Sequence, residues 1–173
     1  EVIYGERYKV LNGENLKPNI MNMIDAVAGN IVDMYCSDAV MPDEWDLAGM
    51  IAYAEEILLP KGALNLKDID LETVKASDLK EMIRKKAREL YDQKEAEFGE
   101  ELMRELERRV LLRVVDEKWM DHIDAMDQLK YGIGLRAYGQ KDPVVEYKRE
   151  GFEMFEEMIR SIQRDTVRML LHI

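Results

Sequence analysis

Three aspartates flank one of two histidines, and these residue types could bind a divalent metal or transfer a proton. Asp121, Asp124 and Asp127 lie close to His122, and carboxylate and imidazole groups act as metal ligands and as general acids or bases. At helical spacing, however, the aspartates share a face with Lys118 and Lys130, which is typical of a solvated helix surface. The surface interpretation is favoured, and an enzyme whose isolated chain is stabilised by metal or substrate remains the alternative.

Other patterns that carry chemistry are missing from the sequence. There is no Gly-x-x-x-x-Gly-Lys-Ser/Thr phosphate-binding loop, and Gly132-x-Gly134 lacks the third glycine of a dinucleotide-binding turn. His122 and His172 are the only histidines, and Cys36 is distant from both in sequence, which argues against a zinc cluster. We therefore expect no catalytic, metal or nucleotide site and no cofactor in this chain.

Residues 132–143 form the best candidate for contact with another molecule. Three glycines permit backbone angles that a helix disfavours: Gly132, Gly134 and Gly139. Asp142 can cap the helix that follows, and Pro143 suits the first position of that helix. The pattern predicts a connecting loop with a flexible body and a defined exit.

The same segment carries apolar side chains that we expect a hairpin to leave unburied: Ile133, Leu135 and Tyr138. Arg136 and Lys141 lie beside them. A tyrosine provides a large contact area with a polar end and loses little rotamer entropy on binding. The alternative is that Tyr138 folds back on the end of the hairpin.

Composition limits the class of protein. The 173 residues (20.2 kDa) are 47% hydrophobic and 35% charged, which fits a folded domain, and the net charge of −11 opposes nucleic-acid binding. Residues 1–106 carry 13 basic and 23 acidic side chains, residues 107–173 carry 12 and 13, and the segment 130–149 has a local charge of +3.

No run reaches the roughly 18–20 apolar residues of a membrane span. We recognise no signal peptide, and the missing initiator Met suggests a piece of a longer chain.

Hydrophobic periodicity predicts helices throughout. We expect the end of a helix over residues 1–11, a helix from Pro18 to Tyr35, and short helices and loops over 36–77. A further helix should begin at Ser77 as its N-cap and reach Phe98, where Gly99 allows a break.

Two apolar seams with alternating steps of three and four mark the last third. The first comprises Leu111, Val115, Trp119, His122, Met126, Leu129 and Ile133. The second comprises Phe152, Phe155, Ile159, Ile162, Thr166, Met169 and Ile173. One seam per helix predicts an antiparallel two-helix hairpin, and hence an all-α fold.

The last third also resembles a known family over several ordered segments. These are Leu112–His122, Ala125–Leu129, Gly132–Pro143, Glu146–Glu150 and Phe152–Phe155. They are similar to the C-terminal helical region of SecA, the ATP-driven motor of bacterial preprotein export. The resemblance implies three parts: helical scaffold (residues 1–36), helical wing (37–106), and two-helix finger with the return to the scaffold (107–173). Ala137, Gly139 and Gly151 depart from the family's usual small residues.

The family resemblance implies a mechanical role and no catalysis by this chain. Nucleotide-binding domains that use ATP and Mg²⁺ belong to the parent protein, at the inner face of the cell membrane, where an anionic lipid surface is a further expected partner. The finger meets a SecY-type channel and the unfolded preprotein, and Tyr138 matches its tip, with Ile133, Leu135, Arg136 and Lys141 alongside. An acidic helical adaptor for protein–protein interaction is the alternative function.

Overall fold

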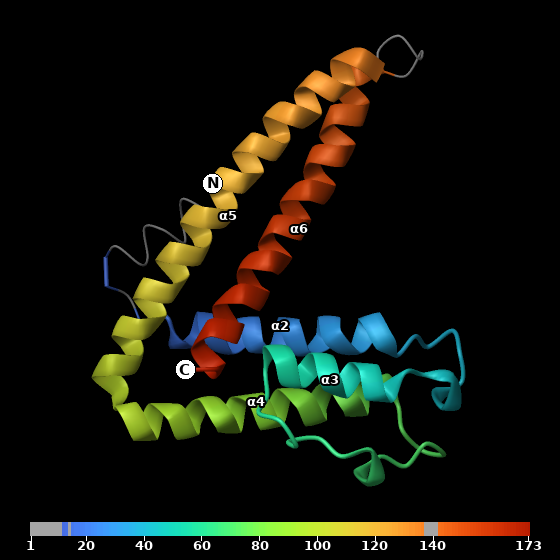
Figure 1. Ribbon diagram of the computed structural model, residues 1–173, viewed down its shortest axis with the longest axis vertical. Helices are drawn as coiled ribbons and strands as arrows, with labels where there is room; N and C mark the ends of the chain where they lie inside the picture. The colour runs from blue at the N-terminus through green and yellow to red at the C-terminus, as the bar shows by residue number, and fades with distance from the viewer. Residues whose placement is uncertain (1–11, 14, 137–141) are drawn as a thin grey trace.

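The computed structural model describes residues 12, 13, 15–136 and 142–173, and these residues form helices and loops without a strand (Figure 1). The predicted all-α fold is confirmed. The helix end expected over residues 1–11 lies outside the described residues. None of the described helices is both long enough and apolar enough to cross a lipid bilayer.

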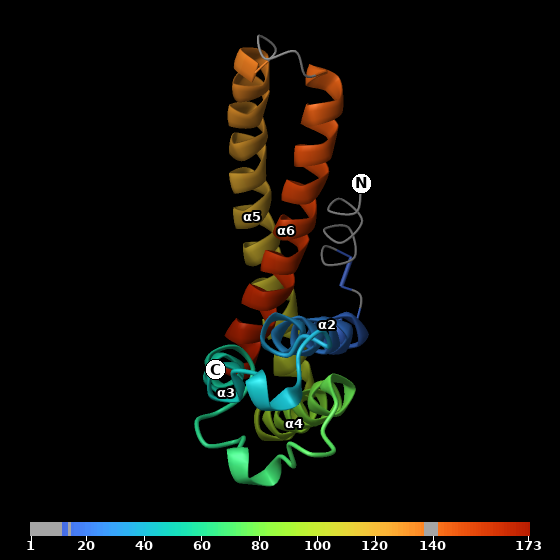
Figure 2. The same ribbon diagram turned by 90° about the vertical axis from the view of Figure 1, so that its right-hand side faces the viewer.

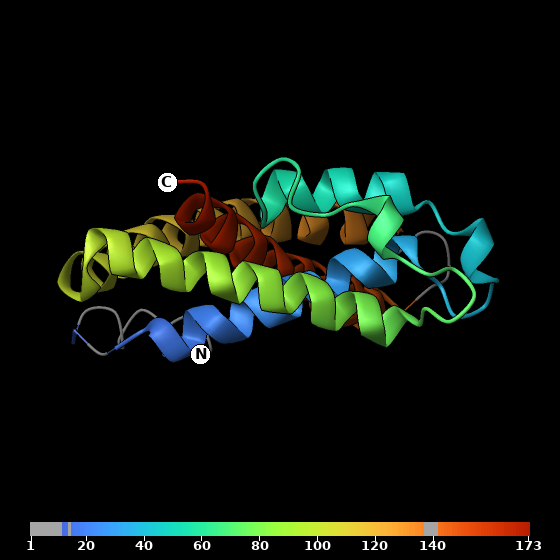
Figure 3. The same ribbon diagram turned by 90° about the horizontal axis from the view of Figure 1, so that it is seen from below.

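Three helices form a base at one end of the molecule: α2 (Lys17–Tyr35), α3 (Leu47–Ile57) and α4 (Ala76–Phe98). Figure 3 shows α4 running alongside α2, with α3 next to them. Two short 3₁₀ turns, Pro42–Glu44 and Leu66–Asp68, interrupt the loops on either side of α3. The regular spacing of buried residues on α2, at positions 20, 24, 27, 28, 31 and 32, places one apolar face in this core.

Side chains at the helix starts explain where the base helices begin. Asp46 Oδ1 accepts from the Gly49 N–H at 2.9 Å, and a Cβ at Gly49 would lie 2.3 Å from Asp46 Oδ2. The prediction that Ser77 is the N-cap of the long base helix is wrong, because α4 begins at Ala76. The cause is Asp78, whose Oδ2 accepts from the Lys75 N–H at 3.0 Å and fixes the turn before Ser77.

Ion pairs join α2 to α4 beside the apolar core. Arg88 binds Asp25 through two nitrogens, at 2.9 and 2.6 Å, and Lys80 Nζ lies 2.7 Å from Asp33 Oδ1. Arg88 ends a basic run of α4, Arg84-Lys85-Lys86-Ala87-Arg88, and this run therefore faces a carboxylate of the same chain in part. Bidentate pairing holds the two helices in one register.

A long hairpin rises from the base (Figures 1 and 2). Its legs are α5 (Glu100–Arg136) and α6 (Pro143–Leu171), about 55 and 43 Å long at 1.5 Å per residue. α5 meets α4 at an elbow formed by Gly99, whose φ is +90°. α6 returns to the base, where Val167, Leu170 and Leu171 are buried in the core of α2, α3 and α4.

The predicted seam of the first leg is confirmed, whereas that of the second is partly wrong. Leu111, Val115, Leu129 and Ile133 are buried, with the remaining three seam residues half-buried. In the second seam, Phe152, Met169 and Ile173 are exposed, and the buried positions of α6 are Gly151, Met158, Ile162, Thr166, Val167, Leu170 and Leu171. The lower half of α6 packs against α2, α3 and α4 as well as against α5, and the apolar spacing within one helix does not record these further partners.

The start of α2 closes the lower end of the hairpin. Leu16, 1% exposed, packs in one cluster with Leu111, Val114, Val115, Met158 and Ile162. The chain division predicted at 36/37 falls just after α2, and the one at 106/107 falls inside α5. The division into scaffold, wing and finger remains a prediction.

Substitution of the elbow glycine should destabilise the fold. Gly99 combines φ +90° with ψ 151°, a region that essentially only glycine occupies, so Gly99→Ala should lower the free energy of unfolding by about 1–3 kcal/mol. Gly29→Ala is the matched control, because Gly29 is helical and nothing lies within 4 Å of an added Cβ. It should stabilise by about 0.5–1 kcal/mol. Chemical denaturation measures both, and a Gly99→Ala protein as stable as the parent would contradict the argument.

Candidate functional site

Exposed apolar side chains gather on the half of the hairpin that is distant from the base. They are Met120, Ile123, Tyr131, Leu135, Val144, Val145 and Phe152, with exposed fractions from 44% at Ile123 to 75% at Tyr131. Burial of such groups elsewhere would remove them from water. This set, the hairpin surface, is the candidate site of contact with another molecule.

The predicted tip residues differ in their exposure to solvent. Leu135 is 58% exposed, as expected, but Ile133 is 5% exposed, so the prediction that the hairpin leaves Ile133 uncovered is wrong. Tyr138 and Lys141 lie outside the described residues, together with Ala137 and Gly139. Arg136 is the last residue of α5. Contact of any of these residues with a polypeptide remains a prediction.

The loop predicted over residues 132–143 begins later than expected, because α5 continues through Gly132 and Gly134 to Arg136. Each helical glycine costs about 1 kcal/mol, and burial of Leu129 and Ile133 in the seam offsets that cost. An added Cβ would find nothing within 4 Å at either glycine. The exit of the loop agrees with expectation: Asp142 Oδ1 accepts from the Val144 N–H at 3.0 Å, and Pro143 begins α6.

Periodicity could have revealed the most exposed member of the hairpin surface. Tyr131 lies two positions from both Leu129 and Ile133, so it points away from the seam that those residues form, and Leu135 follows it one turn later. Val144 and Val145 carried no such signal, because they stand at the start of α6, where few neighbours remain to cover a side chain.

An aromatic cluster and an ion pair hold the two legs together halfway along. The His122 ring lies 5.7 Å from Trp119 and 5.9 Å from Phe155, between centroids. Lys118 Nζ pairs with Asp165 Oδ2 at 2.9 Å. Partial burial lowers the pKa of His122, which favours the neutral imidazole. His122 and Trp119 are both half-buried, in agreement with their predicted places in the seam.

The same geometry does not assemble a metal site in the described part of the chain. Asp121, Asp124 and Asp127 are exposed, and no group of three or more histidine, cysteine or acidic side chains there could hold a metal ion. Cys36 is 2% exposed, and burial raises the pKa of its thiol to about 11, so the reactive thiolate is disfavoured at neutral pH.

The legs approach closely at Gly151, one of the residues that depart from the family pattern. Gly151 is buried, and an added Cβ would lie 2.9 Å from Met126 Cε. The contact is with the flexible end of a methionine, so a serine at this position would require a shift of that side chain.

The fold and its site define an all-helical domain: a compact base that supports a long hairpin with an apolar far end. Residues 1–173 match the family described as the SecA Wing and Scaffold domain. The chain belongs to this family.

Proteins similar to this chain are also described as SecA. "Protein translocase subunit SecA" of Acetivibrio thermocellus is 55% identical over 172 residues, 99% of this chain and 19% of that protein. Those of Carboxydothermus hydrogenoformans and Desulforamulus reducens are 54% and 53% identical over 173 residues, all of this chain and 20% of each. The chain thus spans about a fifth of the length of these relatives.

Acid should weaken the hairpin through His122. A folded-state pKa below the unfolded value means that the unfolded chain binds the proton more readily, so stability is full above about pH 6.5 and falls as the pH drops through the folded-state pKa. His122→Phe should reduce the loss of thermal stability between about pH 8 and pH 5 by roughly 1–2 °C. His172→Phe, at the exposed end of the chain, is the control. Equal pH dependence in the His122→Phe and parent proteins would refute this assignment.

Proposed function

We propose that this chain is the wing, scaffold and finger portion of a SecA-like protein-translocation motor, and that its hairpin contacts the polypeptide being moved. The observation that carries this proposal is the hairpin surface. Seven large apolar side chains stand exposed on the far half of an arm whose base is tightly packed. An isolated domain gains nothing from such exposure, so a partner that covers these side chains is the simplest explanation.

Two features of the arm suit a mechanical role. Both legs are fixed to the base, α5 through the elbow and α6 through Val167, Leu170 and Leu171, so movement of the base moves the far end. The exposed groups are apolar and therefore bind by non-directional burial. This mode of binding tolerates the varied sequences of unfolded chains, whereas a hydrogen-bonding pocket would select among them.

The partners follow from the family. In the longer protein, other domains would bind and hydrolyse ATP with Mg²⁺, and this chain would transmit their motion without catalysis of its own. The hairpin would enter the mouth of a SecY-type channel at the cytoplasmic face of the membrane. Tyr138, Leu135, Arg136 and Lys141 would meet the polypeptide there, and buried Ile133 would hold the end of α5 in place.

One observation favours an adaptor as the second candidate. Residues 18–60 contain eight acidic and no basic side chains, and the loop before α3 exposes Val40 and Met41. An apolar pair among carboxylates could bind a basic, apolar partner without any motor. The full reading frame distinguishes the two: a fused ATPase supports the motor, and a free-standing gene supports the adaptor.

Removal of the tip tyrosine should slow transport by the full-length protein. An aromatic contact contributes about 0.5–1.5 kcal/mol, so Tyr138→Ala should reduce the rate of preprotein transport into membrane vesicles roughly twofold to tenfold, while basal ATP hydrolysis persists. Met34→Ala is the control, because Met34 is an exposed apolar residue of α2 in the base, outside the hairpin surface. A normal transport rate for folded Tyr138→Ala protein would rule out the tip assignment.

A further inference from the structure

Buried polar side chains cross the elbow between α4 and α5. Tyr91 of α4 and Glu107 of α5 are both 0% exposed, and the Tyr91 hydroxyl donates a hydrogen bond to Glu107 Oε2. The two residues lie 16 positions apart in sequence, on opposite sides of Gly99. Their hydrogen bond therefore fixes one point of α5 against one point of α4.

A second contact crosses the elbow next to the first. The Arg104 guanidinium donates a hydrogen bond from Nη2 to Glu107 Oε2 at 3.2 Å on the same helix, and it also pairs with Glu95 of α4. Glu95 in turn binds Lys17 Nζ of α2 at 2.7 Å. We call these five residues, Lys17, Tyr91, Glu95, Arg104 and Glu107, the elbow clasp.

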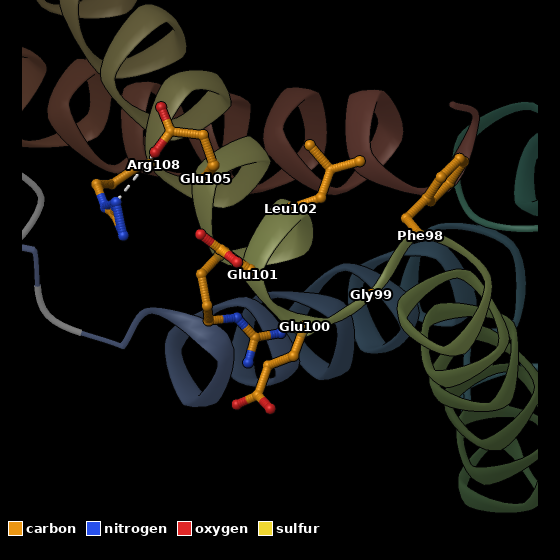
Figure 4. A pocket seen from close by; sticks show the side chains of 8 residues that line it. Phe98, Gly99, Glu100, Glu101, Leu102, Glu105 and Arg108 are labelled. Carbon is orange, nitrogen blue, oxygen red and sulfur yellow. Dashed lines mark hydrogen bonds and ion pairs between the residues drawn. The ribbon is translucent and has the colours of Figure 1, made fainter.

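Apolar packing at the elbow is incomplete. A hollow of about 900 Å³ lies at this corner, and its lining includes Phe98, Gly99, Leu102 and charged residues of the first turns of α5 (Figure 4). Leu102 remains 47% exposed, whereas Met103 is fully buried. The other leg reaches the base through apolar side chains, whose contacts have little directionality. The clasp supplies directional bonds at the joint.

Stability alone does not account for a carboxylate at position 107. Burial raises the pKa of Glu107 even though Tyr91 and Arg104 act to lower it, so the surroundings disfavour the charged form overall. Buried ionic groups of this kind contribute little net stability compared with well-packed apolar residues. They can, however, specify one geometry among several, because their hydrogen bonds hold only at defined distances and angles.

We propose that the elbow clasp sets the angle at which the hairpin leaves the base, and that Tyr91 and Glu107 are its positioning residues. Without their hydrogen bond the elbow becomes a hinge at Gly99. This inference concerns the direction of the arm, and it holds whichever molecule the far end contacts.

Distances between two spin labels on the full-length protein test the proposal. One label replaces Ala52 on α3 and the other replaces Asp127 on α5, both exposed positions, in a background without other reactive cysteines. Tyr91→Phe keeps the ring and removes the hydroxyl. The expected result is a broadened, shifted distance distribution from pulsed electron paramagnetic resonance, with unchanged helix content by circular dichroism.

Two controls separate the elbow from the hairpin. Labels at Asp127 and Glu153, one on each leg, should give the same distribution in the parent and in Tyr91→Phe. Glu117→Gln removes the exposed ion pair with Arg113, 3.3 Å long and within α5, and should leave both label pairs unchanged.

A narrow, unshifted α3–α5 distribution in folded Tyr91→Phe protein would overturn the proposal. If Tyr91→Phe does not fold, Tyr91→Phe/Glu107→Leu replaces the buried polar contact with apolar groups. A broad distribution in this double variant supports the clasp. A narrow one shows that packing alone sets the angle, and it also overturns the proposal.

Discussion

The hairpin can act as an arm only because both of its legs are fixed to the same hydrophobic core. α6 supplies Val167, Leu170 and Leu171 directly to the core of α2, α3 and α4, while α5 is joined to α4 through the elbow. The two legs pack against each other along the hairpin and reach the base at separate places, so base, α5 and α6 form a closed frame (Figure 1). A single anchored helix of comparable length would pivot about its attachment, whereas a closed frame resists tilting within its own plane.

Sequence patterns predicted the helices better than the faces they bury. The bounds of α2 and the end of α4 follow from Pro18, Gly99 and regular apolar spacing. The faces of α6 did not follow, because its lower half packs against the base as well as against α5, and no local spacing records a second partner. Ser77 is not the N-cap because the carboxylate of Asp78 accepts a hydrogen bond from the Lys75 N–H, and the helix already begins at Ala76.

The candidate site was only partly visible in the sequence. Gly132 and Gly134 indicated a loop, but each costs only about 1 kcal/mol in a helix. Burial of the neighbouring Ile133 against α6 offsets this cost, and the sequence around the glycines does not show that burial. The exposed surface of Tyr131 and Leu135 could have been inferred from the seam itself. The candidate residues at 136–141 were selected from the types of their side chains and the glycines around them, and the family resemblance then matched Tyr138 to the tip of the finger.

Two kinds of chemistry therefore divide the work of this fold. Apolar burial is strong but indifferent to direction, which suits both the core that holds the base and the hairpin surface that would meet chains of varied sequence. Charged and hydrogen-bonded groups are costly to bury, and Glu107 is the one fully buried charged residue in the described part of the chain. It stands at the joint, where a small error in angle would be magnified over the roughly 55 Å length of α5. The least stabilising type of buried contact is thus found where direction matters most.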